Sequence, residues 1–228
     1  MTSPKALFLY EEIFLLALRN EKGTISTCYS EYAIAGAILA ELSLGRRISI
    51  DNTRKRLVTL DDARPSGDPI IDEALRKMAT AKRRGSLQTW VSRLAGAKNL
   101  KHNVARQLCH RRILRLDEDK ILFLFTQKTY PEINPVPEKE IVDRVRTALF
   151  SDDDRLDPRT VVLISLANGA DLLGEAFGRK AVKARKKRIE QIVNGEMTGK
   201  ATKEVIAACQ AAVMVAVIMP TLIATTSS

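Results

Sequence analysis

The clearest binding chemistry in the sequence lies in a stretch rich in lysine and arginine. Residues 98–115 read KNLKHNVARQLCHRRILR and hold six lysines and arginines, two histidines and no acid. If residues 98–110 are helical, three apolar side chains share one face and four basic ones share the opposite face. The apolar residues are Leu100, Val104 and Leu108, and the basic ones are Lys98, Lys101, His102 and Arg106. A helix of this kind can pack through one face and bind phosphate through the other. A solvated helix face has the same pattern, and charge alone favours that interpretation.

Side chains that support catalysis are sparse. The only histidines, His102 and His110, lie eight residues apart among lysines and arginines, which disfavours a bound cation. Glu11 and Glu12 are expected on an exposed helix face, and the aspartates at 152–154 in an exposed turn, rather than in an acid–base pair. The sequence has none of the short motifs of nucleotide-phosphate loops, zinc hydrolases or serine hydrolases. We therefore expect a protein without catalysis, cofactor or metal.

The composition indicates a globular, basic protein. Its 228 residues are 45% hydrophobic and 28% charged, with a formal net charge of +10. A basic surface attracts nucleic acid, anionic lipid headgroups or an acidic protein, and charge alone does not choose among them. Three widely separated cysteines and the lack of a secretory signal at the N-terminus favour a reducing, cytoplasmic compartment.

The elements that would position these residues are mostly helices. Helical periodicity and cap residues predict helices over 4–19, 31–44, 69–79, 86–94, 98–110, 138–150, 158–177 and 180–193. Asp68 is expected to cap the third of these helices, and Trp90 to lie in the core. Two short β-hairpins are expected at 46–60 and 111–125, with turns at Asp51-Asn52 and at the acidic residues after 116. The 111–125 hairpin is also a candidate surface for self-association.

The apolar segment from Val205 to Ala224 approaches the length of a membrane-spanning helix. It is rich in alanine and valine, contains Gln210 and lacks flanking aromatic anchors, so we favour a helix buried in a helical domain. The expected fold is therefore mostly α. It is one compact helical domain over residues 1–228, with a core at about 6–219, a buried hydrophobic C-terminal helix and two short β-hairpins.

Several stretches together resemble the Golgi phosphoprotein 3 family, in the order and at nearly the spacing of that family. They are LFLYEEIFLLALRNEKG at 7–23, ILAELSLGRRI at 38–48, SGDPIIDEAL at 66–75, LQTWVSRLAG at 87–96 and LISLANGADLLGEAF at 163–177. The resemblance implies a mostly helical domain whose hydrophobic C-terminal helix lies at its centre. It also implies a cytosolic, peripheral membrane protein that binds phosphatidylinositol 4-phosphate. In eukaryotic members this binding supports Golgi retention of glycosyltransferases and contact with coat proteins.

The resemblance also implies which residues bind the headgroup. Two basic residues of the family's pocket, three apart, fall on Lys98 and Lys101. The family's tryptophan has no counterpart here, because Ser26 or Cys28 takes its place and Tyr29 is the nearest aromatic residue. The family's arginine falls on Ala35. Arg106 is a further basic candidate. The chain also lacks the long basic N-terminal tail of eukaryotic members, so coat-protein binding is not expected.

We expect a lipid-binding adaptor whose partners are an anionic phospholipid headgroup and membrane-protein clients. Two alternatives remain open at this point. A helix followed by a hairpin, as at 98–125 and at 46–60, has the outline of a winged-helix DNA-binding unit. Against DNA binding, the candidate recognition helix has no Asn, Gln or Arg pattern clustered at its N-terminus to contact base edges. The aromatic residues do not interleave with the basic ones, which disfavours stacking on a single strand. The other alternative is a helical scaffold whose basic face binds an acidic protein.

Overall fold

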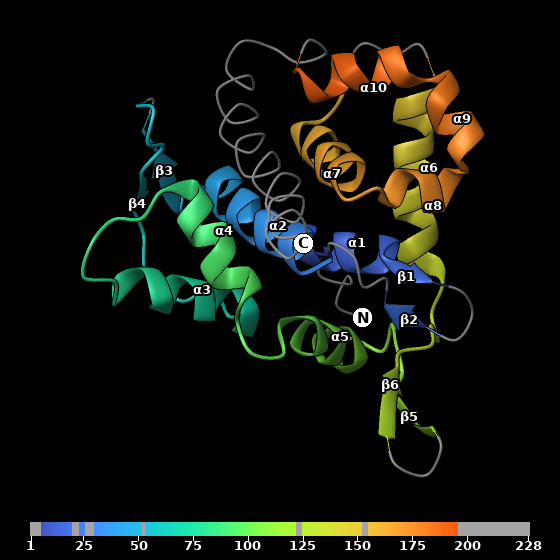
Figure 1. The fold of residues 1–228 in the computed structure, drawn as a ribbon, viewed down its shortest axis with the longest axis horizontal. Helices are drawn as coiled ribbons and strands as arrows, with labels where there is room; N and C mark the ends of the chain where they lie inside the picture. Colours follow the sequence, from blue (N-terminus) through green and yellow to red (C-terminus); the bar gives the residue numbers. More distant parts are fainter. Residues whose placement is uncertain are drawn as a thin grey trace, which may run out of the picture.

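The protein is built mainly of short helices, which confirms the predicted fold class (Figure 1). The computed structural model describes residues 6–19, 23–25, 30–51, 53–121, 125–151 and 155–195. Its helices are α1 (Leu9–Leu16), α2 (Ser30–Leu44), α3 (Pro69–Ala79), α4 (Leu87–Ala95), α5 (Leu100–His110), α6 (Val136–Phe150), α7 (Pro158–Gly169), α8 (Leu172–Phe177), α9 (Arg179–Ala184) and α10 (Lys186–Val193). Its strands are β1 (Leu18–Arg19), β2 (Thr24–Ile25), β3 (Ile48–Ile50), β4 (Val58–Leu60), β5 (Asp117–Ile121) and β6 (Phe125–Thr129).

Helices α1 and α2 form the centre of the described part of the chain. Every residue of α1 is buried, and α1 packs against α2, α5, α6 and α7. Helix α2 is buried on nearly all sides, because small residues such as Ala33, Ala35, Gly36 and Ala37 let neighbouring helices approach closely. The segments that carry the basic residues thus pack against an apolar core.

Two carboxylates within this core contradict the sequence expectation. Glu11 and Glu12 are only 0% and 4% exposed, so the prediction of an exposed helix face is wrong. Arg111 lies 2.6 Å from Glu11, while Arg144 and Arg159 lie 2.7 and 3.4 Å from Glu12. Burial raises the pKa of Glu11 to about 7 and also raises that of Glu12, although the paired arginines act in the opposite direction. The sequence did not reveal this burial, because the arginines come from distant segments.

Local signals at the start of α3 and along α4 are confirmed. Asp68 caps α3 by accepting hydrogen bonds from the N–H groups of Ile70 and Ile71 at 3.0 and 2.9 Å. Trp90 is 3% exposed and belongs to the core, as predicted.

The hairpin predicted at 46–60 is present as β3 and β4, with Ile48 opposite Leu60. Its loop is longer than the predicted two-residue turn: the Asp51 carboxylate accepts a hydrogen bond from the Leu57 N–H at 3.0 Å. The first helix ends at Leu16, earlier than predicted. Strand β1 takes the place of its predicted last residues and pairs antiparallel with β2. Gly23, with φ of 65°, lies so close to the Tyr130 backbone that a Cβ atom would be 2.0 Å from its carbonyl oxygen.

The second hairpin forms farther along the chain than predicted and projects from the helical body (Figure 1). Asp117 pairs with Thr129 and Glu118 with Lys128, so the acidic residues lie in strand β5 and not in the turn. The Glu118 and Lys128 side chains form an ion pair at 3.7 Å across the strands. Residues 122–124, between the two strands in the sequence, lie outside the described residues. Whether this hairpin supports self-association stays a prediction.

Two predicted long helices are each divided in two. The helix predicted over 158–177 ends at Gly169, and Asp171 has a left-handed backbone with φ of 58° before α8 begins. The helix predicted over 180–193 is interrupted at Arg185, whose guanidinium donates to the Phe150 carbonyl oxygen at 2.9 Å. A left-handed residue cannot continue a right-handed helix, which accounts for the first break.

The apolar segment at 205–224, predicted as a buried helix, lies outside the described residues, as do Ser26 and Tyr29. None of the helices in the described ranges is long and apolar enough to cross a membrane.

Candidate functional site

Lys98 lies in a tight turn that joins α4 to α5. The Ala97 N–H donates to the Leu94 carbonyl at 3.0 Å, and the Leu100 N–H donates to the Ala97 carbonyl at 3.2 Å. Leu94 and Leu100 are buried on either side of the turn, and Asn99 has a left-handed backbone with φ of 58°. These constraints leave the Lys98 side chain exposed between two anchored leucines.

The N-terminus of α5 has neither a side-chain cap nor an acidic residue in its first turn. Asn99 is the residue that precedes the helix. The first N–H groups of a helix point outward and carry partial positive charge, which favours an anion there. Lys98 and Lys101 stand on either side of this helix start in the chain and add two formal positive charges.

Lys101 has a carboxylate partner on α2. Its ammonium lies 3.1 Å from a carboxylate oxygen of Glu31, and the two side chains are 28% and 30% exposed. The pair connects the first turn of α5 to the first turn of α2. A phosphate that binds Lys101 therefore competes with Glu31 for the same ammonium. Glu31 could not be identified from the sequence, since nothing local relates residues so distant in the chain.

His102 adds no cation beside these lysines at neutral pH. Burial, and then the charge of Lys101, lower the pKa of its imidazole below the ordinary value of 6.5. Its Nδ1 atom forms a 2.8 Å hydrogen bond with the Tyr130 hydroxyl. His102 is therefore better placed to join α5 to the end of strand β6 than to bind a ligand.

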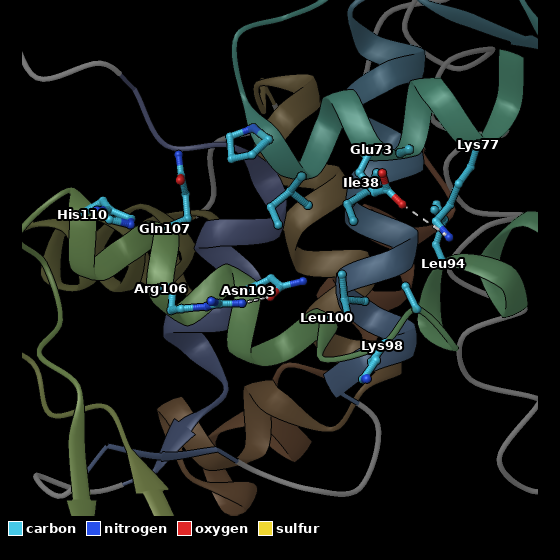
Figure 2. Close-up of a pocket in the computed structure, with 14 residues that line it drawn as sticks. Ile38, Glu73, Lys77, Leu94, Lys98, Leu100, Asn103, Arg106, Gln107 and His110 are labelled. Atoms are coloured by element: carbon cyan, nitrogen blue, oxygen red, sulfur yellow. Dashed lines mark hydrogen bonds and ion pairs between the residues drawn. The ribbon is translucent and has the colours of Figure 1, made fainter.

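A groove of about 520 Å³ lies between α2, α3, α4 and α5 (Figure 2). Its floor is apolar and its edges carry polar and charged groups. The apolar lining is Ile38, Pro69, Ile70, Ala74, Leu94, Ala97 and Leu100, and the polar lining is Glu73, Lys77, Lys98, Asn103, Arg106, Gln107 and His110. Figure 2 shows Lys98 and His110 at opposite ends of this groove.

Several charged groups at the edges of the groove have partners of their own. Glu73 on α3 forms ion pairs with Arg76 at 2.7 Å and with Lys77 at 3.5 Å. On α5, the Arg106 guanidinium donates a hydrogen bond to the Asn103 side-chain oxygen. The structure thus brings Lys98 and Arg106 to one groove, while Lys101 is engaged with Glu31 outside its lining.

The other positions discussed for headgroup binding contribute little to this surface. Ala35 is 0% exposed within α2, so it provides neither charge nor accessible surface. Tyr29 and Ser26 lie outside the described residues. Of the positions discussed for headgroup binding, Lys98 and Lys101 are the described residues that lie beside the start of α5.

Comparison with known proteins assigns the chain to a family. A family model described as Golgi phosphoprotein 3 (GPP34) matches residues 9–209. The chain belongs to this family. A curated relative, vacuolar protein sorting-associated protein 74 of Eremothecium gossypii, is 27% identical over 206 aligned residues, which cover 75% of this chain and 62% of the relative. The chain thus corresponds to less than two thirds of that relative. The mostly helical fold and family membership agree with the expectations from the sequence.

Proposed function

We propose that this Golgi phosphoprotein 3 family member is a peripheral membrane adaptor that binds anionic phosphoinositide headgroups of the phosphatidylinositol 4-phosphate type. The binding residues are Lys98 and Lys101, with Arg106 as a more distant basic contributor. The observation that carries this proposal is the exposed Lys98 at the uncapped start of α5, one turn from Lys101. In this proposal the protein works by binding and has no catalytic step.

The chemistry of a phosphomonoester fits this helix start. Its charge is favoured by the partial positive charge of the helix N-terminus and by two lysine ammonium groups. Other exposed cations would add attraction of about 1 kcal/mol each near an anionic membrane. Lysines lack the two-pronged geometry of arginine, so we expect affinity to depend strongly on salt and weakly on the exact headgroup.

The family supports the wider role. Family membership supports a protein that associates with a membrane from the cytoplasm and contacts membrane-protein clients. The clients, and Tyr29 as an aromatic contact with the membrane, belong to the proposal. The name of the Eremothecium gossypii relative, a vacuolar protein sorting-associated protein, supports a role in protein sorting.

Vesicle sedimentation tests the proposal. The wild type, Lys98→Ala/Lys101→Ala, and Lys180→Ala/Lys187→Ala are compared on phosphatidylinositol 4-phosphate vesicles and on plain anionic vesicles of equal charge. The control removes two exposed lysines of α9 and α10 and gives the same net charge. We expect the first variant to lose about tenfold in affinity for the phosphoinositide, and the control to stay near wild type. Equal binding by all three proteins would remove the proposed site, and tighter binding to duplex DNA would favour the DNA-binding alternative.

A further inference from the structure

A second concavity, separate from the groove beside Lys98, lies where the β3–β4 loop meets the start of α4. It encloses about 720 Å³ and is lined by six cationic side chains, and no carboxylate is among its described lining residues. The cations are Arg54, Lys55, Arg56, Arg83, Arg84 and Arg93. All six are exposed. We refer to this site as the arginine hollow.

Backbone hydrogen bonds hold the two arginine-rich segments of the hollow together. The Val58 N–H donates to the Gly85 carbonyl at 2.9 Å, and the Leu87 N–H donates to the Arg56 carbonyl at 2.9 Å. Leu57 and Ser86 form an antiparallel bridge between these bonds. The segments that carry Arg54–Arg56 and Arg83–Arg84 are therefore held side by side. This arrangement keeps their positive charges close together.

The acid closest in the chain to this cluster is used by the loop itself. Asp51 accepts hydrogen bonds from the Thr53 hydroxyl at 2.7 Å and from the Leu57 N–H at 3.0 Å. The Thr53 hydroxyl chiefly, and the charge of Arg84 more weakly, lower the pKa of Asp51. Asp51 thus shapes the loop and offsets part of the charge of Arg84, but it is not part of the lining of the hollow.

Two of the arginines are held by neighbouring side chains. The Arg84 guanidinium donates to the Thr59 hydroxyl at 3.1 Å. The Arg93 guanidinium lies over the ring of Trp90, 5.0 Å from its centroid, and Trp90 is itself buried. Cation–π contact of this kind restrains a guanidinium while leaving its N–H groups available at the edge. The hollow therefore presents cations that are partly positioned before a ligand arrives.

We infer that the arginine hollow binds a group in which two or more phosphoryl units are clustered, as in a polyphosphate or a pyrophosphate headgroup. Several arginine forks gathered in one hollow match many closely spaced phosphate oxygens better than they match a single carboxylate. The volume is that of a small-ligand site. The buried Trp90 and the lack of aromatic lining leave no surface on which nucleic-acid bases stack, so a compact anion is favoured over a single strand.

Titration calorimetry with sodium tripolyphosphate tests the site. Arg54→Gln/Arg83→Gln removes two exposed charges from the hollow, and Lys180→Gln/Lys187→Gln removes two exposed charges elsewhere. We expect the hollow variant to bind at least about tenfold more weakly, and the control to bind like the wild type. Fluorescence of Trp90, the only tryptophan, provides a second readout because Arg93 lies over its ring. No binding by wild type, or an equal loss in both variants, would overturn the inference.

Further comparisons identify the source of the phosphate and keep this site separate from the proposed headgroup site. Vesicles with diacylglycerol pyrophosphate are compared with phosphatidylglycerol vesicles of equal charge. A preference for the pyrophosphate lipid that Arg54→Gln/Arg83→Gln abolishes assigns a lipid source, whereas tripolyphosphate binding without that preference assigns a soluble one. Lys98→Ala/Lys101→Ala should keep the tripolyphosphate binding that Arg54→Gln/Arg83→Gln removes. Duplex DNA that binds more tightly than tripolyphosphate, and whose binding the hollow variant loses, would replace the inference with nucleic-acid binding.

Discussion

Replacing Glu31 with glutamine should strengthen headgroup binding, because Glu31 competes with a phosphate for Lys101. Unit charges 3.1 Å apart attract each other by about 1.3 kcal/mol in water. Both side chains are about 30% exposed, so screening and side-chain entropy reduce the value to about 0.5–1 kcal/mol. Glu31→Gln should release this amount and raise the affinity for phosphoinositide vesicles about two- to fivefold.

The assay is vesicle sedimentation at low salt, with Glu140→Gln as the matched control. Glu140 is exposed on α6, and its substitution raises the net charge by the same amount. The gain from Glu31→Gln should exceed that of the control and should disappear when Lys101 is alanine, as a double-mutant cycle would show. An equal gain in both variants would mean that only net charge matters. A loss of affinity would mean that Glu31 positions Lys101 for binding, and either result refutes the competition.

Three further predictions concern stability. Asp68→Ala should lower the free energy of unfolding in urea by about 2–3 kcal/mol, since it removes the α3 cap and the 2.7 Å hydrogen bond from the Tyr10 hydroxyl; a loss below about 1 kcal/mol would contradict this. Arg159→Met should cost about 3 kcal/mol, because Glu12 stays buried with one partner fewer, and Glu12→Gln in the same chain should recover part of that loss. Burial raises the pKa of Glu132 to about 7 from 4.5. The contribution of Glu132 to the free energy of unfolding is therefore most favourable below pH 4.5, where its carboxyl is protonated, and is lost as the pH rises through 7. Glu132→Gln should therefore stabilise the protein at pH 8 by about 1 kcal/mol, after allowance for solvent screening, and the gain should vanish near pH 4 in thermal melts.

Features with a local cause were predictable from the sequence. The start of α3 follows from Asp68 as cap and Pro69 in the first turn, and the core position of Trp90 follows from helical spacing within α4. These signals act within one or two helical turns, so a single segment contains all the information they need. The family resemblance rested on several such segments in order.

Features that depend on distant partners were not predictable. Glu11 looks like a surface residue until Arg111, one hundred residues later, is placed beside it. The acidic residues after 116 look like a turn until Lys128 pairs with Glu118 across the hairpin. A charged residue indicates an exposed segment only when no oppositely charged residue from a distant part of the chain pairs with it.

The candidate sites show the same division. Lys98 and Lys101 were expected from the family resemblance, whereas Glu31 as a partner of Lys101 required the packing of α5 on α2. The arginine hollow combines segments about thirty residues apart, and the bond from Leu87 to Arg56 brings them together. Each segment alone resembles an ordinary basic loop.

A crystal structure of the protein with the soluble headgroup inositol 1,4-bisphosphate tests the central claim most directly. The proposal predicts that the phosphomonoester lies at the start of α5, within hydrogen-bond distance of the ammonium groups of Lys98 and Lys101. It also predicts that Lys101 has exchanged Glu31 for a phosphate oxygen. A headgroup bound only in the arginine hollow, or a start of α5 without bound phosphate at saturating ligand, would contradict the account.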